Sequence, residues 1–103
     1  MGYSALRSQI IRASMSIPAN IVEGRRQESE RDFARFLRYS LNSAHELEYH
    51  VTLARDISVV PAGDANSLLA EGVEVTRMLH GLLRKLNAPA VRPPDPSSSK
   101  TPV

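Results

Sequence analysis

The sequence contains no cysteine among its 103 residues. Disulfide bonds and thiolate metal sites are therefore excluded, and a reducing compartment such as the cytoplasm fits this composition. No apolar run approaches the roughly 18 residues that a membrane-spanning helix needs. The N-terminus also lacks the basic and then apolar pattern of a signal peptide. We therefore expect a cytoplasmic protein with no membrane segment.

The excess of positive charge is small, because the chain has 13 Lys and Arg residues and 11 Asp and Glu residues. A net charge of +2 does not by itself indicate nucleic-acid binding, so the distribution of the arginines has to decide. A hydrophobic content of 42% predicts a folded core rather than a disordered chain. A single core of this size is modest, and assembly with partners commonly supplements it.

Three long segments show helical periodicity between recognisable start and stop signals. The sequence predicts helices over about residues 4–23, 30–57 and 62–87. The connections are short, so we expect an all-α, up-down antiparallel helical bundle. Beyond these helices, prolines and serines without periodicity predict a disordered tail over residues 88–103, which leaves residues 1–87 as the helical bundle domain.

The predicted helix ends carry characteristic residues. Ser4 is expected to cap the first helix, and Gly24 is expected to end it in a left-handed conformation. Ser29 should cap the second helix, and Pro61 stands at the entrance to the third.

The first and third helices have apolar arcs of about 200°, twice the stripe of an ordinary surface helix. A bundle of only three helices would leave much of this surface in water, so we expect a fourth helix or other subunits to cover it. The apolar rows of the first helix are Leu6, Ile10, Ile17 and Ile21, and Ile11, Met15, Pro18 and Val22; the seam of the third is Leu68, Gly72, Val75, Leu79, Leu82 and Leu86.

Pro18 lies inside the most apolar part of the first helix. It removes one backbone donor and crowds the carbonyl of Ser14, which predicts a kink. The hydroxyls of Ser14 and Ser16 can satisfy the freed groups. The alternative is that the helix breaks into two pieces at this point.

A narrow polar strip on the first helix has apolar residues on both flanks. If part of it is buried, it must be hydrogen-bonded throughout, whereas the simpler alternative is a solvated face. We expect Arg12 to reach a glutamate of the second helix and Asn20 to bond nearby groups. The predicted structural polar network consists of Arg12, Ser16, Asn20, Glu23, Glu46 and Glu48.

The segment HELEYH resembles a zinc motif but does not fit one. Zinc-binding histidines lie four residues apart on one helical face, whereas His45 and His50 are five apart. No phosphate-binding loop and no nucleophile–histidine–acid arrangement stands out. We therefore expect no metal, no cofactor and no enzymatic activity, and an unrecognised hydrolase remains the minor alternative.

Five arginines form the best candidate for nucleic-acid contact. Their spacing suits successive phosphates, and Tyr39 or Tyr49 can stack on a base. The alternative is a solvated face that neighbouring acidic residues partly neutralise. The candidate contact residues are Arg25, Arg26, Arg31, Arg35 and Arg38.

The first helix contains the pattern Arg12-x-x-x-Ser16-Ile17-Pro18-Ala19-Asn20-Ile21-Val22-Glu23-Gly24. This pattern resembles the hallmark of a known family, the 23S rRNA-intervening-sequence proteins. Further blocks resemble Phe33-x-x-Phe36-Leu37, Ser43-Ala44-x-Glu46-Leu47-Glu48, Arg77-Met78-Leu79 and Leu82-Leu83-x-x-Leu86.

The resemblance implies a bacterial four-helix bundle that assembles into a barrel-shaped homopentamer with a basic exterior. By this comparison the first family helix is missing here, which leaves three helices. Family members commonly have a basic residue three positions after this glycine, whereas the present chain has Gln27 there. A related branch serves as the accessory protein of the reverse transcriptase in diversity-generating retroelements, which implies that enzyme or another protein as a partner, together with nucleic acid.

The sequence and the resemblance together predict a non-enzymatic, homo-oligomeric helical bundle that binds RNA or DNA. The rival is a structural or protein-interaction module without a nucleic-acid role, in which the apolar faces bind another protein and the arginines only keep the surface hydrated.

Overall fold

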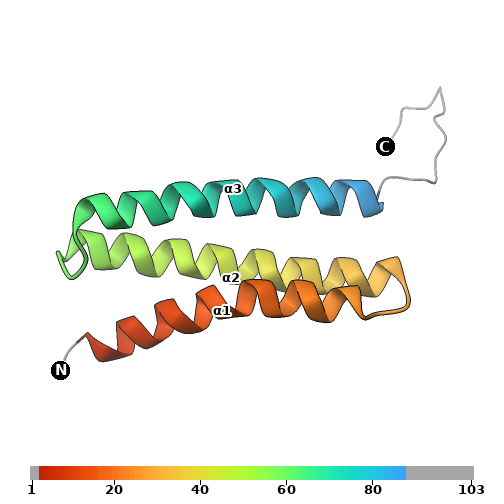
Figure 1. Cartoon of the computed structure of the whole chain (residues 1–103), viewed down its shortest axis with the longest axis horizontal. Coiled ribbons are helices and arrows are strands. Elements are labelled where there is room, and N and C mark those ends of the chain that lie inside the picture. Colours follow the sequence, from red (N-terminus) through yellow and green to blue (C-terminus); the bar gives the residue numbers. More distant parts are fainter. Residues whose placement is uncertain (1–2, 88–103) are drawn as a thin grey trace.

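The computed structural model describes residues 3–87 of the chain. These residues form three α-helices, α1 (Ser4–Arg25), α2 (Glu30–Asp56) and α3 (Ala62–Asn87), and no strand. The helices run up, down and up, with α2 between its two neighbours (Figure 1). The predicted all-α, up-down arrangement is confirmed. The predicted tail, residues 88–103, lies outside the described residues.

The ends of α1 differ from the prediction. Ser4 is already helical, and Tyr3 precedes it at the cap position without a side-chain hydrogen bond. Gly24 does not end the helix in a left-handed conformation, because no described glycine has a positive φ. Arg26 ends α1 in a right-handed conformation. Its backbone N–H bonds the carbonyl of Glu23 at 3.1 Å, and the N–H of Gln27 bonds the carbonyl of Gly24 at 3.1 Å. Both capping predictions for α1 are therefore wrong.

A glycine at position 24 is required for a different structural reason, its close approach to α2. A Cβ atom added at this position would lie 2.8 Å from Cδ1 of Phe33 and 2.9 Å from Cβ of Phe36. Real Cβ atoms essentially never approach other atoms this closely. Gly24 is buried, so its missing side chain is what lets the end of α1 lie directly against the start of α2.

The two ends of α2 are closed in different ways. The hydroxyl of Ser29 accepts a hydrogen bond of 3.1 Å from the backbone N–H of Asp32, as the sequence predicts for an N-cap. At the other end Ser58 has a φ of 63°, and the N–H of Val59 bonds the carbonyl of Ala54 at 2.8 Å. Ser58 thus takes the left-handed position that glycine commonly fills after a helix.

Small and apolar residues of α2 form the centre of the molecule. Leu37, Ser40, Ala44, Val51 and Ala54 are all buried and form the inner face of this helix. An apolar core cluster lies where α2 begins and α3 ends. It consists of Ala34, Leu37, Leu79 and Leu83, with Ile21, Phe33, Leu41, Val75 and Leu86 packed around it.

Helix α1 passes through Pro18 without a break, so the alternative of two separate pieces is wrong. Figure 1 shows that α1 changes direction near its middle, with its N-terminal half sloping away from α2. The Ser14 hydroxyl donates to the carbonyl of Ile11 at 2.8 Å, within the distorted turn. From α2, the Ser40 hydroxyl donates to the carbonyl of Ile17 at 2.8 Å. These bonds tie the turns on either side of Pro18 to α1 itself and to α2. The hydroxyls of Ser14 and Ser16 bond Ile11 and Ser43, not the Ser14 carbonyl that Pro18 leaves without a backbone donor.

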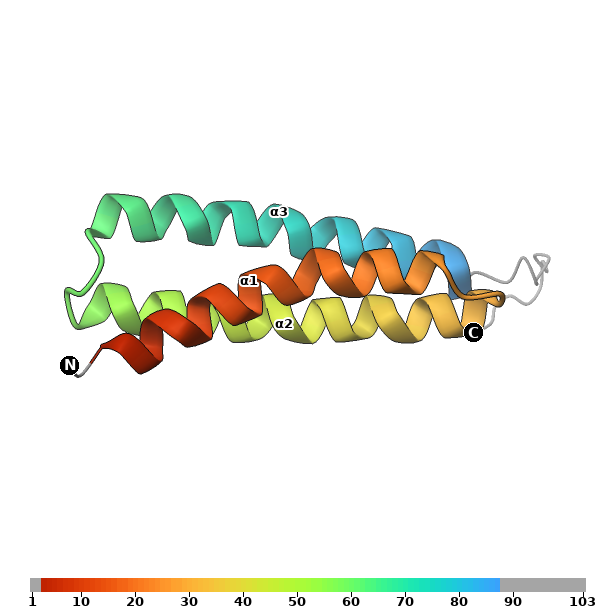
Figure 2. The same ribbon diagram turned by 60° about the horizontal axis from the view of Figure 1, so that its bottom comes forward.

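Helices α1 and α3 both pack on α2 and approach each other less closely, with no Cα atom of one within 8 Å of a Cα atom of the other. The same three helices seen from another side are shown in Figure 2. Among the described residues no helix combines the length and the apolar character that crossing a membrane requires.

Candidate nucleic-acid interface

The outer face of α2 carries one continuous polar stripe. All six of its residues are exposed, which agrees with the helical spacing of the sequence. At 1.5 Å per residue the stripe runs for roughly 27 Å. From the start of the helix it comprises Arg31, Arg35, Arg38, Asn42, His45 and Tyr49.

The three arginines of the stripe share a shallow hollow with Ser29 and Asp32. The N-terminus of α2 opens onto this hollow, and the partial positive charge of a helix N-terminus adds to that of the guanidinium groups. Asp32 offsets part of this charge. The arrangement suits an anion such as a phosphate.

Arg35 is already engaged by its own helix. Its guanidinium donates to the hydroxyl of Tyr39 at 3.3 Å and to Oδ1 of Asp32 at 3.4 Å. It also lies 4.9 Å from the ring centre of Phe36. The hydrogen bond to Tyr39 is the main cause that raises the pKa of Arg35 above its ordinary value. Arg35 is therefore a positioned cation that helps to shape the hollow.

Arg31 and Arg38 differ from Arg35 in having no partner. Among residues 3–87 neither side chain makes a hydrogen bond or an ion pair. Arg25, the last residue of α1, and Arg26, which follows it, are exposed and likewise form no ion pair within the described part of the chain. These four arginines can bind an anion without first breaking an internal ion pair.

Two further basic residues, Arg84 and Lys85, reach the same end of the molecule from the last turn of α3. They lie there because α3 is antiparallel to α2, as Figure 1 shows. They are not among the candidate residues that the sequence indicates, although the predicted up-down topology already places the end of the third helix beside the start of the second. Basic residues at a helix C-terminus also favour the helix dipole, so their presence alone does not require a ligand.

Aromatic rings lie at the middle and far end of the stripe. The rings of Tyr39 and Phe36 are 5.4 Å apart in an edge-to-face arrangement. The rings of Tyr49 and His50 are 5.2 Å apart in a similar arrangement. Tyr49 is 65% exposed, so its ring is accessible to a base.

The predicted polar network is only partly brought together. Ser16 and Asn20 face α2, where the Ser16 hydroxyl lies 2.8 Å from the hydroxyl of Ser43. The Asn20 amide donates to the carbonyl and the hydroxyl of Ser16 at 2.9 and 3.0 Å. The sequence analysis did not predict Ser43 as a partner; its place on the inner face of α2, beside the small residues, was the available signal.

The charged members of that network lie on the surface instead. Arg12 Nη2 is 3.9 Å from Glu46 Oε1, and both side chains are more than half exposed. Arg12 also bonds Gln9 on its own helix. Glu23 accepts from the Gln27 amide at 3.1 Å through its backbone carbonyl. Glu48 forms no ion pair within residues 3–87 and lies at the groove described next.

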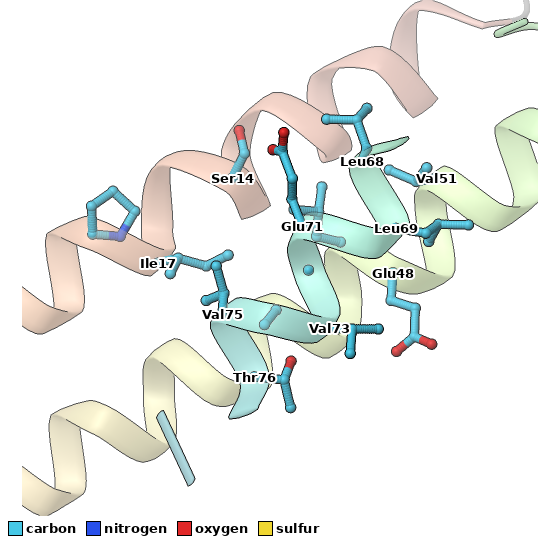
Figure 3. Close-up of a pocket in the computed structure, with 14 residues that line it drawn as sticks. Ser14, Ile17, Glu48, Val51, Leu68, Leu69, Glu71, Val73, Val75 and Thr76 are labelled. Carbon is cyan, nitrogen blue, oxygen red and sulfur yellow. The ribbon is translucent and has the colours of Figure 1, made fainter. Parts of the chain in front are cut away.

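An apolar groove of about 410 Å³ lies over α2, between α1 and α3. Figure 3 shows Ile17 of α1 and Val75 of α3 directed toward one another across it. Glu71 extends from α3 toward Ser14 of α1 in the same view. The remaining lining is mostly aliphatic and includes Pro18, Leu47, Val51, Leu68 and Leu69. The groove can accept an apolar side chain or helix more readily than a polar ligand.

No metal centre is built by the described residues, since no group of three histidine, cysteine or acidic side chains gathers in residues 3–87. His45 is exposed on the stripe. Nδ1 of His50 is buried and has no hydrogen-bond partner in the described part of the chain.

Comparison with known proteins identifies the family. The family model of the 23S rRNA-intervening sequence proteins matches residues 3–81, which is most of the chain. The chain belongs to the 23S rRNA-intervening sequence protein family. The matched residues cover both α1 and α2, and with them the whole polar stripe.

Among solved structures, this 23S rRNA-intervening sequence protein is similar to a protein of unknown function from the S23 ribosomal protein family of Bacteroides thetaiotaomicron. The TM-score is 0.75 and the sequence identity 28%, over 77% of this chain and 73% of that one. No curated protein sequence matches. The comparisons thus establish the family and the fold.

Proposed function

We propose that this 23S rRNA-intervening sequence protein is a non-enzymatic, homo-oligomeric nucleic-acid-binding protein of the cytoplasm that contacts RNA or DNA through the outer face of α2. It would act beside a nucleic-acid enzyme, such as a reverse transcriptase. The observation that carries the proposal is the pair Arg31 and Arg38, which are exposed on one helical face without an internal partner in the described residues.

The geometry favours contact with the phosphate backbone. Arg31 and Arg38 are seven residues apart, or roughly 10 Å along α2, and their long side chains can reach different phosphates of one strand. Tyr49 then lies farther along the same face, where an unpaired base can stack on its ring. Several copies of the chain in one particle would repeat the stripe and raise the affinity by avidity.

The test uses a fluorescein-labelled RNA hairpin with a single-stranded loop and fluorescence anisotropy. The stripe variant combines Arg31→Gln with Arg38→Gln. The control variant combines Arg12→Gln with Arg77→Gln, which removes the same charge from two exposed arginines that are paired elsewhere. We expect affinity to fall steeply with salt, and the salt slope to decrease by roughly 0.7 for each phosphate that a variant no longer neutralises.

The stripe variant should therefore bind more weakly and less salt-dependently than the control variant. Equal binding by the two variants would mean that only net charge matters, and no binding by the natural chain would remove the nucleic-acid role. The apolar groove supports a second candidate, a protein-interaction module. In that case assembly with a protein partner would be insensitive to salt and unaffected in the stripe variant.

A further inference from the structure

The cations on the outer face of α2 are crowded at one end of the helix. Arg31, Arg35 and Arg38 all lie in its first part, and over residues 39–54 the helix has no lysine or arginine. A strand that lay along the whole stripe would therefore meet positive charge at one end only. This distribution suits a single concentrated anion better than a row of evenly spaced phosphates.

The charge of the hollow that these arginines line indicates which anion it is. Of the described residues that line it only Asp32 is acidic, so two of the three positive charges are uncompensated. A phosphate inside a nucleic-acid strand carries one negative charge, whereas a phosphate monoester carries nearly two at neutral pH. The hollow therefore matches a monoester, the form in which a phosphate stands at the end of a strand.

The arginines of the hollow are arranged for one shared ligand. Arg35, in the middle, is held by Asp32 and Tyr39, so its position does not depend on a ligand. Arg31 lies one turn before it and Arg38 one turn after it, and neither has a partner in the described part of the chain. Like charges one turn apart repel each other. A phosphate beside Arg35 would relieve this repulsion and accept hydrogen bonds from all three guanidinium groups.

The hollow also has room and a stacking surface for the nucleotide attached to that phosphate. Its volume of about 520 Å³ is in the range of small-molecule sites. Tyr39 is 42% exposed, and its ring is fixed by the hydrogen bond from Arg35 and by the edge-to-face contact with Phe36. A base that follows the phosphate can stack on this ring without first ordering it.

We infer that the hollow binds the terminal phosphate of a single-stranded nucleic acid, with Arg31, Arg35 and Arg38 around the phosphate and Tyr39 beside the terminal base. An internal phosphate can contact the same arginines, but a strand end supplies the second negative charge that the hollow can neutralise. The inference rests on the proposed nucleic-acid binding, and it names the part of the strand that the stripe recognises.

Fluorescence anisotropy with one short unpaired RNA, labelled internally with fluorescein, tests the inference. The RNA is prepared with a 5′-phosphate, with a 3′-phosphate and with hydroxyl groups at both ends, so that the two kinds of strand end are separated. The natural chain should bind at least one phosphorylated RNA about 10-fold more tightly than the hydroxyl RNA. An RNA with hydroxyl ends and one additional nucleotide controls for total charge and should gain less than about twofold.

The ratio of the two affinities is the quantity that assigns the preference to the hollow. The stripe variant, with Arg31→Gln and Arg38→Gln, should lower this ratio to about 1, and each single substitution should give an intermediate value. The matched control combines Arg25→Gln with Arg26→Gln, two exposed arginines that do not line the hollow. It should weaken the binding of every RNA and leave the ratio unchanged. Circular dichroism of each variant checks that the helices are retained.

The possible failures are distinguishable. If the natural chain binds all four RNAs with equal affinity, the hollow does not recognise a strand end, and the proposed nucleic-acid contact survives without this preference. If the ratio persists in the stripe variant, or if the control variant loses it as completely, the preference comes from overall charge and the inference is overturned. If the natural chain binds none of the RNAs, the inference and the proposed nucleic-acid role are both overturned.

Discussion

Replacement of Gly24 by alanine tests the packing of α1 on α2. The added Cβ would lie 2.8 Å from a ring carbon of Phe33 and 2.9 Å from Cβ of Phe36. The Phe33 ring can turn aside, but the Cβ of Phe36 is fixed by its backbone. The two helices must therefore separate locally.

The size of the effect follows from two opposing contributions. Overpacking of this kind costs about 1–3 kcal/mol, whereas alanine is favoured over glycine inside a helix by about 1 kcal/mol. Because two of the distances are too short and one of the two atoms cannot yield, we expect a net destabilisation of about 1–2 kcal/mol. With a slope of about 1 kcal/mol per molar urea, the denaturation midpoint should fall by about 1–2 M.

The assay is urea denaturation followed by circular dichroism at one fixed protein concentration, because the self-association that we propose would contribute to the apparent stability. Gly81→Ala is the control, since the nearest atom to a Cβ there, Nη2 of Arg84, is at an ordinary 3.9 Å. That variant should be more stable by about 0.5–1 kcal/mol. If Gly24→Ala is as stable as the natural chain or more stable, the close-approach explanation of this glycine is wrong.

Three further substitutions test separate features. Ser40→Ala removes the buried hydroxyl that bonds the Ile17 carbonyl, and it should lower the free energy of unfolding by about 1 kcal/mol in urea denaturation. Ser8→Ala, on the exposed side of α1, should change the stability little. Equal stability of both variants would show that the kink needs no support from α2. Ser58→Gly should stabilise the chain by about 0.5–1 kcal/mol, because glycine takes a φ of 63° without steric strain. A decrease in stability would contradict the assigned backbone conformation. Arg12→Ala should lower the free energy of unfolding by less than about 0.5 kcal/mol, since the distance from Arg12 to Glu46 is long and both side chains are exposed. A loss comparable to that of Ser40→Ala would mean that this ion pair is stronger than its geometry implies.

The helices and their faces were accessible from sequence because they depend on local periodicity. The predicted span of α3, residues 62–87, and the Ser29 cap agree with the structure. The ends of α1 did not follow from local rules, since Gly24 is chosen by its contact with α2 and not by its own backbone conformation. A residue that serves a neighbouring helix is hard to assign from its own segment.

In the candidate site, too, features within one helix followed from the sequence, whereas contacts between helices did not. The stripe on α2 lies on one helix, so its spacing alone predicted that its residues share a face. Arg84 and Lys85 join its end only through the antiparallel topology. Hydrogen bonds between helices, such as Ser16 with Ser43, depend on the register between α1 and α2, which the sequence did not specify. The exposure of Leu68 and Leu82 likewise depends on which side of α3 meets α2.

The most direct measurement of the central claim is a titration of the isotope-labelled full chain with the RNA hairpin, followed by hydrogen–nitrogen correlation NMR. The largest shifts should occur in residues 25–38, around Arg31 and Arg38, and should diminish as salt increases. Shifts confined to the groove-lining residues of α3, or no shifts at all, would contradict it.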